Sequence, residues 1–428
     1  MVVDWELTTL GAEAELICGF PFRSSEYTDN PCDVRLLRGD NIVQGNIRWA
    51  NAKRWSLEDA ANFEQYELKK DDVVLAMDRP WIDAGLKYAA IGDDDLPCLL
   101  LQRTSRLRGG QNLDIRFLRY VIGSPEFTKH IQSITTGSLV PHISSRQIKD
   151  FAFKLPPLAT QKRIAAVLSA LDAKIALNQR INLELEGMAK LLYDYWFVQY
   201  DFPLSAAQAA ALGKPRLAGQ PYRTSGGKMV FNPQLKREIP KGWVAKELSD
   251  IAEITMGQSP PGNTYNNEQN GVLFFQGSTD FGWRYPSPRQ YTTAPTRMAR
   301  KGDILLSVRA PVGTLNIAPE ECAIGRGLSA LRSKSGSSSF LFQILQNLQQ
   351  VFVRRNGDGT TFGSINRDDL RSLQLAYPSE EDIIHTFDKI VSETDALIFA
   401  NHQQNQQLTA LRDWLLPMLM NGQVRVTE

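Results

Sequence analysis

The stretch LPPLATQKRIAAVLSALDAKIALNQRINLELEGMAKLLYDYW, Leu155 to Trp196, lies in the middle of a chain of 428 residues. It opens with a proline pair and then continues for about forty residues without a Gly-Pro turn signal. At 1.5 Å per residue, this pattern predicts a single helix roughly 60 Å long. Sequence of globular character flanks the helix on both sides, so its role has to be explained together with its two neighbours.

The chain repeats itself around this helix. Residues 137–156 (GSLVPHISSRQIKDFAFKLP) align without gaps on residues 359–378 (GTTFGSINRDDLRSLQLAYP), and LDAKIALNQ from Leu171 matches TDALIFANHQ from Thr394, 223 residues later. Upstream, KDDVVLAMDRP matches KGDILLSVRAP. Several blocks match in the same order, and the period is far longer than that of solenoid repeats. The sequence therefore indicates the tandem duplication of a whole domain.

Each copy has the pattern of a mixed α/β globule followed by a long helix, which predicts an α+β fold. Short apolar runs such as VVLAM and ILLSV indicate strands, and FAFKLP and LQLAYP alternate like strands just before each helix. Between the copies, an Ala-rich stretch followed by turn formers is typical of a linker. The predicted segments are a globular domain at 1–157, a long helix at 158–200, a linker at 201–242, a second globular domain at 243–379 and a second long helix at 380–428.

Both helices carry a narrow apolar stripe at alternating spacings of three and four residues. Such a stripe is typical of a coiled-coil seam, and it predicts that the two helices pair as an antiparallel coiled coil. An amphipathic helix packed on its own globule is the alternative. The stripe consists of Ile164, Leu168, Leu171, Ile175, Leu185, Met188, Leu192 and Tyr195 in the first helix, and Phe387, Val391, Thr394, Ile398, Leu408, Leu411 and Leu415 in the second.

Asparagines interrupt both stripes at equivalent places. Asn178 and Asn182 fall in the first seam, and Asn401 and Asn405 fall in the second. In an antiparallel pair these amides would meet near the helix midpoints, where buried amides can fix the register of a coiled coil. Solvent-facing residues at a stutter of the stripe are the alternative explanation.

The composition favours a cytoplasmic protein that carries no cofactor or metal. The formal net charge is +1, and the four cysteines and four histidines are scattered without metal-ligand spacing. There is no secretory leader pattern and no apolar run long enough for a bilayer span. Signatures of a phosphate-binding loop, a dinucleotide fold, a zinc protease, a serine hydrolase and an amino-methyltransferase are all missing. We therefore expect that the chain itself catalyses no reaction.

Polar loops in the two globules are the remaining candidates for function. Arginine can contact guanine through two hydrogen bonds, and asparagine or glutamine can contact adenine in the same way, while Ser, Thr and Lys bind phosphates. For any single residue a solvated surface role is the alternative, and the matched turns can serve as turn structure or phosphate contacts. The candidates for DNA binding are Arg23, Ser24, Gln44, Arg103, Arg106, Thr135, Thr136, Ser138 and His142 in the first copy, and Gln258, Ser259, Thr264, Gln276, Arg284, Arg309, Arg326, Thr360, Thr361 and Ser364 in the second.

Three stretches resemble the specificity subunit of type I restriction–modification systems. They are PLATQKRIAAVLSALDAKIALN after a proline, the repeated GTT-type turn before each helix, and YRTSGGKMVFNPQLKREIPKGW, Tyr222 to Trp243. The resemblance covers nearly the whole chain. It implies that each globule is a target recognition domain for one half of a split, asymmetric site in double-stranded DNA, and that the long helices hold the two domains apart.

The resemblance also implies partners. In the family, the helices dock two modification subunits that methylate adenine at N6 after flipping it out of the duplex, and motor-nuclease subunits complete the restriction enzyme. Two alternatives stay open. One is a recognition subunit of another multisubunit restriction–methylation enzyme, and the other is a coiled-coil scaffold that binds no DNA.

Overall fold

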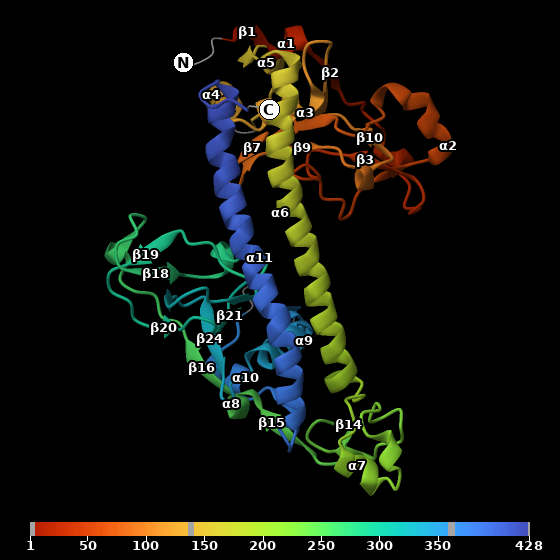
Figure 1. Cartoon of the computed structure of the whole chain (residues 1–428), viewed down its shortest axis with the longest axis vertical. Coiled ribbons are helices and arrows are strands. Elements are labelled where there is room, and N and C mark those ends of the chain that lie inside the picture. Colours follow the sequence, from red (N-terminus) through yellow and green to blue (C-terminus); the bar gives the residue numbers. More distant parts are fainter. Residues whose placement is uncertain (1–4, 136–140, 358–363, 427–428) are drawn as a thin grey trace. The chain divides into compact units, whose positions relative to one another are not determined.

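The computed structural model describes residues 5–135, 141–357 and 364–426. The chain divides into two compact units, one formed by Met1–Asn178 with Gln403–Glu428 and the other by Gln179–His402. Both boundaries fall inside the two long helices, α6 (Leu158–Tyr193) and α11 (Asp382–Met420), the yellow-green and blue helices of Figure 1. Each unit thus combines one globule with part of both helices, and the units cut across the five segments proposed from the sequence.

The first unit contains a five-stranded sheet in the order β2-β11-β6-β9-β4 and a three-stranded sheet in the order β10-β3-β5. Two smaller pairs, β1 with β12 and β7 with β8, complete its strands. The strands are β1 (Glu6–Thr9), β2 (Ala14–Cys18), β3 (Val34–Leu37), β4 (Gln44–Gly45), β5 (Arg54–Trp55), β6 (Val73–Ala76), β7 (Trp81–Ile82), β8 (Gly85–Leu86), β9 (Tyr88–Ala90), β10 (Cys98–Leu100), β11 (Thr104–Gly109) and β12 (Ala152–Leu155). The short helices are α1 (Leu10–Glu13), α2 (Leu57–Ala60), α3 (Ile115–Ile122), α4 (Pro125–Thr135) and α5 (Ser145–Lys149).

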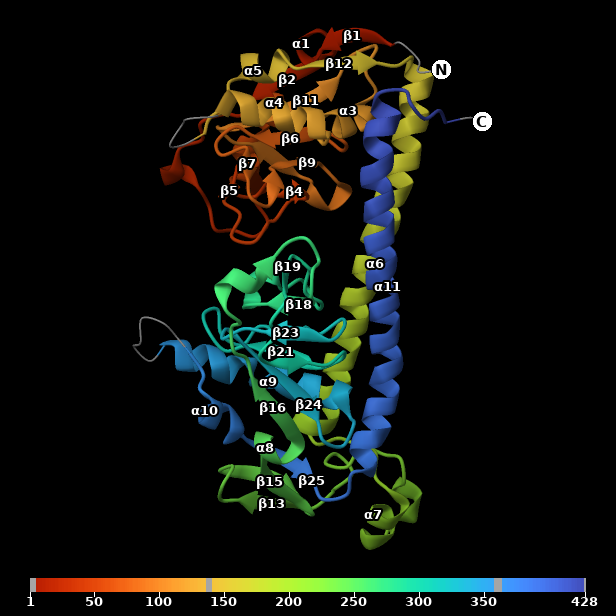
Figure 2. The same cartoon turned by 90° about the vertical axis from the view of Figure 1, so that its left-hand side faces the viewer.

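The second unit contains a four-stranded sheet in the order β16-β24-β21-β22 and a five-stranded sheet in the order β17-β19-β18-β23-β20, with the pairs β13-β14 and β15-β25 (Figure 2). The strands are β13 (Met229–Asn232), β14 (Arg237–Pro240), β15 (Trp243–Glu247), β16 (Ala252–Met256), β17 (Tyr265–Asn266), β18 (Val272–Phe275), β19 (Gln290–Thr292), β20 (Met298–Ala299), β21 (Ile304–Ser307), β22 (Leu315–Ile317), β23 (Cys322–Ile324), β24 (Leu328–Ser333) and β25 (Gln374–Pro378). The helices are α7 (Ala206–Ala211), α8 (Leu248–Ile251), α9 (Ser338–Gly357) and α10 (Arg367–Arg371). None of the helices in the described part of the chain is both long and apolar enough to cross a membrane.

The two globules share the same strand register, as the duplication predicts. In the first unit Leu107 pairs with Leu16 on one side and Val73 on the other. In the second unit Leu331 pairs in the same way with Ile254 and Ile304. The FAFKLP and LQLAYP segments form β12 and β25, which pair with β1 and β15. A mixed α/β domain has therefore been copied together with its hydrogen-bond pattern.

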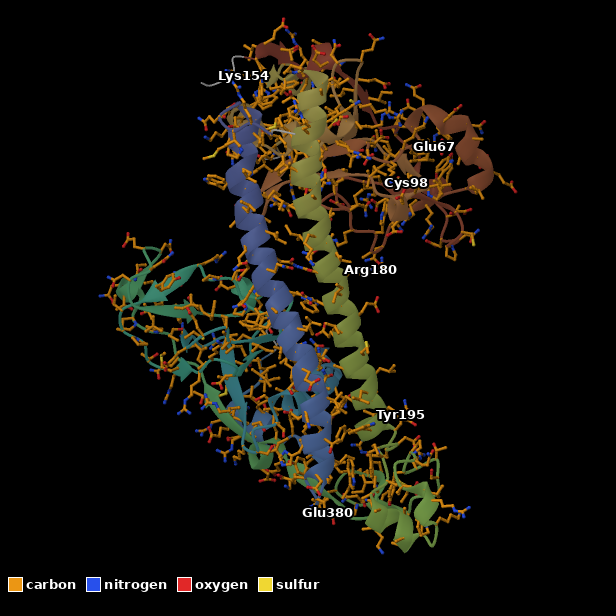
Figure 3. All side chains as sticks on the ribbon, in the orientation of Figure 1. Glu67, Cys98, Lys154, Arg180, Tyr195 and Glu380 are labelled. Carbon is orange, nitrogen blue, oxygen red and sulfur yellow. The ribbon has the colours of Figure 1, made fainter. Side chains whose placement is uncertain are left out.

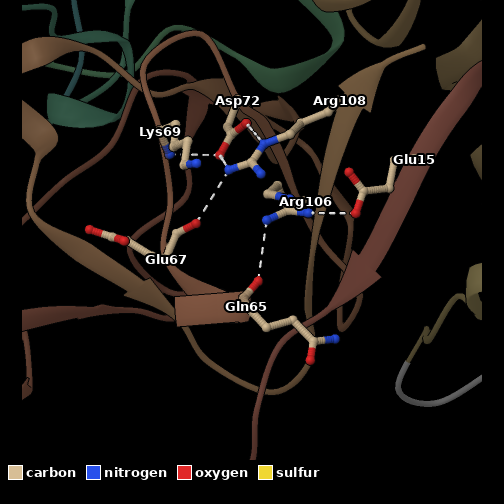
Figure 4. Close-up of polar contacts among 7 residues, drawn as sticks. All are labelled: Glu15, Gln65, Glu67, Lys69, Asp72, Arg106 and Arg108. Atoms are coloured by element: carbon tan, nitrogen blue, oxygen red, sulfur yellow. Dashed lines mark hydrogen bonds and ion pairs between the residues drawn. The ribbon is translucent and has the colours of Figure 1, made fainter. Parts of the chain in front are cut away.

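A buried aspartate paired with a partly exposed arginine stabilises each copy at the same place. Arg108 binds both carboxylate oxygens of Asp72, at 2.5 and 2.8 Å (Figure 4), and Arg332 binds those of Asp303, at 2.7 and 2.7 Å. Two parallel charge-assisted hydrogen bonds hold β11 against the loop before β6 in the first unit, and β24 against the loop before β21 in the second. These two arginines therefore have a structural role within their globules.

The segment predicted as a linker is folded. Residues 201–242 contain α7 and the β13-β14 hairpin, and their aromatic side chains enter the main hydrophobic core of the second unit. Phe202 stacks between Tyr222 and Trp243, with ring centroids 4.7 and 5.4 Å away. The turn formers in this segment indicated a linker, and burial of these rings gives that linker a fixed structure.

The two long helices pair as an antiparallel coiled coil, and the seam continues without a break. Buried or partly buried residues recur at spacings of three and four along α6 and the π-helical turn Asp194–Val198 that follows it: Asn178, Asn182, Leu185, Ala189, Leu192 and Trp196. The predicted seam positions Met188, Tyr195 and Leu411 are wrong, because all three side chains are exposed; Tyr195 is labelled in Figure 3. Their places in the 3.5-residue repeat belong to Ala189, Trp196 and Arg412.

The seam asparagines pair with one another across the helices. In the first unit Asn178 Nδ2 donates to Asn405 Oδ1 over 2.9 Å and to Gln404 Oε1 over 2.7 Å. In the second unit Asn401 Nδ2 donates to Asn182 Oδ1 over 2.8 Å. The duplication relates Asn178 to Asn401 and Asn182 to Asn405, so the two amide pairs are equivalent.

The variant with Asn178→Leu and Asn401→Leu tests a register role for these amides. It disrupts both pairs while adding apolar area to the seam, so we expect unchanged or higher thermal stability but loss of a unique register. Site-directed crosslinking between the helices should then yield more than one set of partners. A single set of crosslinks, together with full activity in the assembled complex, would argue against this role.

Candidate nucleic-acid interface

In the second unit, loops that carry predicted polar residues meet at one edge of the sheets. The backbone N–H of Gln258, which follows β16, donates to the carbonyl of Ile324 at the end of β23 over 3.0 Å. The N–H of Arg326 donates to Oγ of Ser259 over 3.3 Å. The β16 and β23 loops are therefore fixed against each other, with Arg326 exposed between them.

Two glycines bring a third loop into this cluster. The N–H of Gly327 donates to the carbonyl of Gln276 over 3.1 Å. A Cβ atom at either Gly325 or Gly327 would lie 2.8 Å from backbone atoms of Gln276. Only glycine permits so close an approach between the two backbones.

The loop after β21 joins the same edge. The N–H of Val308 donates to the carbonyl of Gly327 over 2.9 Å, and Arg309 forms a β-bridge with Ser364. The structure thus brings together six of the predicted residues, Gln258, Ser259, Gln276, Arg309, Arg326 and Ser364.

The first unit repeats this arrangement with different side chains. The N–H of Met77 donates to the carbonyl of Arg103, and that of Ile143 donates to the carbonyl of Met77, each over 2.9 Å. Asp78 forms a β-bridge with His142, at the position of the Arg309–Ser364 bridge. The predicted residues Arg103 and His142 therefore lie together at this edge.

Asp78 holds both of these side chains. Its Oδ2 accepts from Arg103 Nη1 over 2.8 Å and its Oδ1 lies 2.5 Å from His142 Nδ1. Partial burial alone would raise the pKa of Asp78, but the hydrogen bonds from His142 and Arg103 lower it below its usual value. The carboxylate therefore stays ionised at neutral pH. Asp78 was not predicted, although the aligned blocks from Lys70 and Lys301 place it opposite Arg309.

Lys87 also lies near Asp78, in a mixed group of charged side chains. Burial lowers the pKa of Lys87, and the nearby guanidinium groups of Arg79 and Arg48 lower it further, while Asp40 and Asp78 act in the opposite direction. The ammonium group and the two guanidinium groups can contact phosphates, while Asp40 and Asp78 balance part of their charge. Lys87, Arg79 and Arg48 were not among the predicted residues.

The remaining described candidates lie in other elements and turns. Arg23 precedes the 3-10 turn Ser24–Glu26 and is exposed, 3.7 Å from Glu26. Gln44 Nε2 donates to the carbonyl of Gly85, and Thr264 Oγ1 donates to the carbonyl of Pro261. Thr135 ends α4. Thr136, Ser138, Thr360 and Thr361 lie outside the described residues.

Arg106 is not available for DNA contact. Its side chain is buried, with Nη2 3.0 Å from Glu15 Oε1 and Nη1 donating to the carbonyl of Gln65 over 3.3 Å (Figure 4). The prediction for Arg106 is wrong because its side chain, on β11 between β2 and β6, is buried inside the globule.

Arg284 is also an interior residue, with a side chain only 1% exposed. Its Nη2 lies 2.5 Å from Asp395 Oδ1 on α11, and its Nη1 lies 3.6 Å from Glu186 on α6. The duplicate of Asp395 is Asp172, which binds Arg412 and Tyr120 in the first unit. Arg284 therefore anchors the second globule to the helices, and the prediction that it contacts DNA is wrong.

Large apolar residues are exposed at equivalent places on the two helices. Met188 and Leu191 are exposed on α6, and their duplicates Leu411 and Trp414 are exposed on α11. Leu191 is 68% exposed and Trp414 55%. Exposed apolar residues that recur at equivalent places are typical of a surface for a protein partner.

A family model described as the type I restriction modification DNA specificity domain matches residues 3–187 and 240–410, one match for each copy. The chain belongs to this family. Its globules are the target recognition domains of a type I specificity protein. Within the described ranges no group of three or more His, Cys, Asp or Glu side chains could hold a metal ion.

Individual relatives agree with this family. The chain is 32% identical over 292 residues to a putative type I restriction enzyme MjaX specificity subunit of Methanocaldococcus jannaschii, an alignment that spans 66% of this chain and 62% of the relative, less than two thirds of its length. It is 23% identical to the type I restriction enzyme HindI specificity subunit of Haemophilus influenzae, over 98% of this chain and 100% of that one. The crystal structure of a type I S subunit from M. genitalium covers 99% of this chain and 97% of its own, with 14% identity and a TM-score of 0.57, which shows the shared fold.

Proposed function

We propose that this specificity protein recognises a bipartite, asymmetric DNA site, one half with each target recognition domain, and directs adenine-N6 methylation and restriction by partner subunits in the cytoplasm. The observation that carries the proposal is the pair of equivalent loop edges. The backbone hydrogen bonds of the two edges are equivalent, but the side chains differ. Asp78 and His142 in the first edge correspond to Arg309 and Ser364 in the second. One scaffold that presents two different polar surfaces suits two different half-sites. Recognition belongs to this chain, and the chemistry belongs to its partners.

DNA binding by the purified chain tests this proposal against a non-DNA scaffold. Electrostatic contacts to several phosphates release counterions, so affinity for a duplex should fall roughly a thousandfold or more between 50 and 200 mM salt. Binding measured by fluorescence anisotropy at several salt concentrations gives the slope. Absence of binding at low salt, by the chain alone and by the assembled complex, would reject the DNA role.

The helices are proposed to dock two modification subunits. The pairs Met188–Leu191 and Leu411–Trp414 are related by the duplication, so the chain offers the same apolar surface twice. Two copies of one partner need two equivalent surfaces. Motor-nuclease subunits would join the complex formed in this way.

Charge placed on one of these surfaces should remove one partner. With Leu191→Glu we expect native mass spectrometry of the reconstituted complex to show one modification subunit in place of two, and with Trp414→Glu the same loss. Charge in the desolvated centre of an interface is strongly unfavourable, and a tryptophan often dominates binding there.

Leu183→Glu is the matched control, because Leu183 is exposed on α6 but its duplicate is the polar Gln406. It should leave both subunits bound. Two bound subunits in the Leu191→Glu, Trp414→Glu double variant would exclude these surfaces.

A further inference from the structure

One position carries opposite charge in the two recognition domains although its backbone setting is the same. Asp78 follows β6 and Arg309 follows β21, and each forms the β-bridge that closes its loop edge. Arg309 is exposed and makes no ion pair with any other described residue. Asp78, in contrast, is engaged on both carboxylate oxygens.

The two partners of Asp78 keep free hydrogen-bonding groups. Arg103 and His142 have side chains 70% and 54% exposed. Among the described residues, Nη2 and Nε of Arg103 and Nε2 of His142 make no hydrogen bond. Arg103 also adopts a φ of 64°, a left-handed conformation that costs a residue with a Cβ roughly 1–2 kcal/mol. An arginine kept there suggests that its side chain is used.

The hydrogen bond to Asp78 also determines which hydrogen-bonding group His142 exposes at Nε2. When Nδ1–H donates to the carboxylate, the neutral ring offers Nε2 as an acceptor. Arg103 then offers donors beside this acceptor. In the major groove a G·C pair presents the complementary set, with acceptors at guanine N7 and O6 and a donor at cytosine N4.

We infer that Asp78 is the positioning residue of a G·C-contacting site in the first recognition domain, holding Arg103 toward guanine and His142 toward the cytosine amino group. At the equivalent point of the second domain Arg309 contacts DNA itself, with no carboxylate to orient it. The inference rests on the proposed function, since it names the base pair that this loop edge selects. Lys87, which lies near Asp78, and its neighbours Arg79 and Arg48 supply attraction for the neighbouring phosphates, partly offset by Asp40.

The test uses the assembled methyltransferase complex and the duplex that the wild type modifies, together with duplexes in which each G·C pair of the first half is replaced. Asp78→Asn should reduce discrimination at one G·C pair roughly 5- to 150-fold, the range of a good bidentate contact. Discrimination in the second half and the thermal midpoint of the chain should not change. A purely structural role would lower affinity for all duplexes equally.

A mutant cycle tests whether Asp78 acts through Arg103 and His142. If it does, adding Asp78→Asn to the variant with Arg103→Ala and His142→Ala should cause no further loss of discrimination at that pair. Arg309→Ala should alter discrimination only in the second half. Unchanged selectivity in Asp78→Asn, or a first half without any G·C pair, would overturn the inference. Lack of any duplex preference in the wild type would instead reject the proposed function.

Discussion

Deletion of one facing heptad from each long helix is expected to shorten the gap in the recognised DNA site by about three base pairs. The Asn178–Asn405 and Asn182–Asn401 contacts identify residues 179–185 and 398–404 as facing heptads. Seven residues correspond to about 10 Å of helix, and B-DNA rises about 3.4 Å per base pair. Because the deletion retains the Asn178–Asn405 pair and the heptad phase, the coiled coil should still form. Sequencing of methylated DNA from cells that carry the variant gives the new gap.

Deletion of 179–185 alone is the matched control for this prediction. It leaves 398–404 without a facing partner and breaks the register, so assembly of the complex should fail. Should the double deletion modify the original site with the original gap, the helices do not determine the distance between the half-sites.

Replacement of the buried Arg284 is expected to have the largest effect on stability. Arg284→Met leaves the carboxylates of Asp395 and Glu186 in a desolvated site, and removing one partner of a buried ion pair costs about 3–5 kcal/mol. The guanidinium also lies 4.4 Å from the centre of the Phe342 ring, so packing is lost as well. For a unit of this size we expect the melting temperature to fall by roughly 10 °C, measured by calorimetry.

Lys190→Met provides the control in the same unit. Lys190 pairs with Asp194 over 2.6 Å, with side chains 61% and 29% exposed, and exposed pairs contribute about 1 kcal/mol or less. A second variant, with Arg284→Met, Asp395→Leu and Glu186→Leu, removes the whole charged group and should recover much of the loss. Equal melting temperatures for Arg284→Met and the wild type would show that the anchor contributes nothing.

The features predicted well from the sequence are those that repeat or are periodic. The duplication fixed the equivalence of β12 and β25, and the spacing of three and four predicted the helix pair. The asparagines were recognised as seam residues because each pair recurs 223 residues later. Such signals survive without knowledge of tertiary contacts, because they appear directly as matching residue types at a constant offset or spacing.

The predictions that failed depend on contacts that a sequence does not display. Met188 and Leu411 are apolar and lie one position from the seam, so hydrophobicity alone placed them there, while Arg412 occupies a seam position because Asp172 neutralises it. Arg106 and Arg284 resemble surface arginines until the strand register and the helix carboxylates are known. Asp78 was not predicted because an acidic side chain does not bind phosphates. Its proposed role depends on its hydrogen bonds to Arg103 and His142.

Mapping of N6-methyladenine in host DNA, with and without this chain, is the most direct test of the central claim. We expect methylation to disappear on removal of the chain from one asymmetric sequence made of two separated halves, and to return when the chain is restored. Methylation elsewhere in the genome should not change. An identical map in both strains would contradict the account.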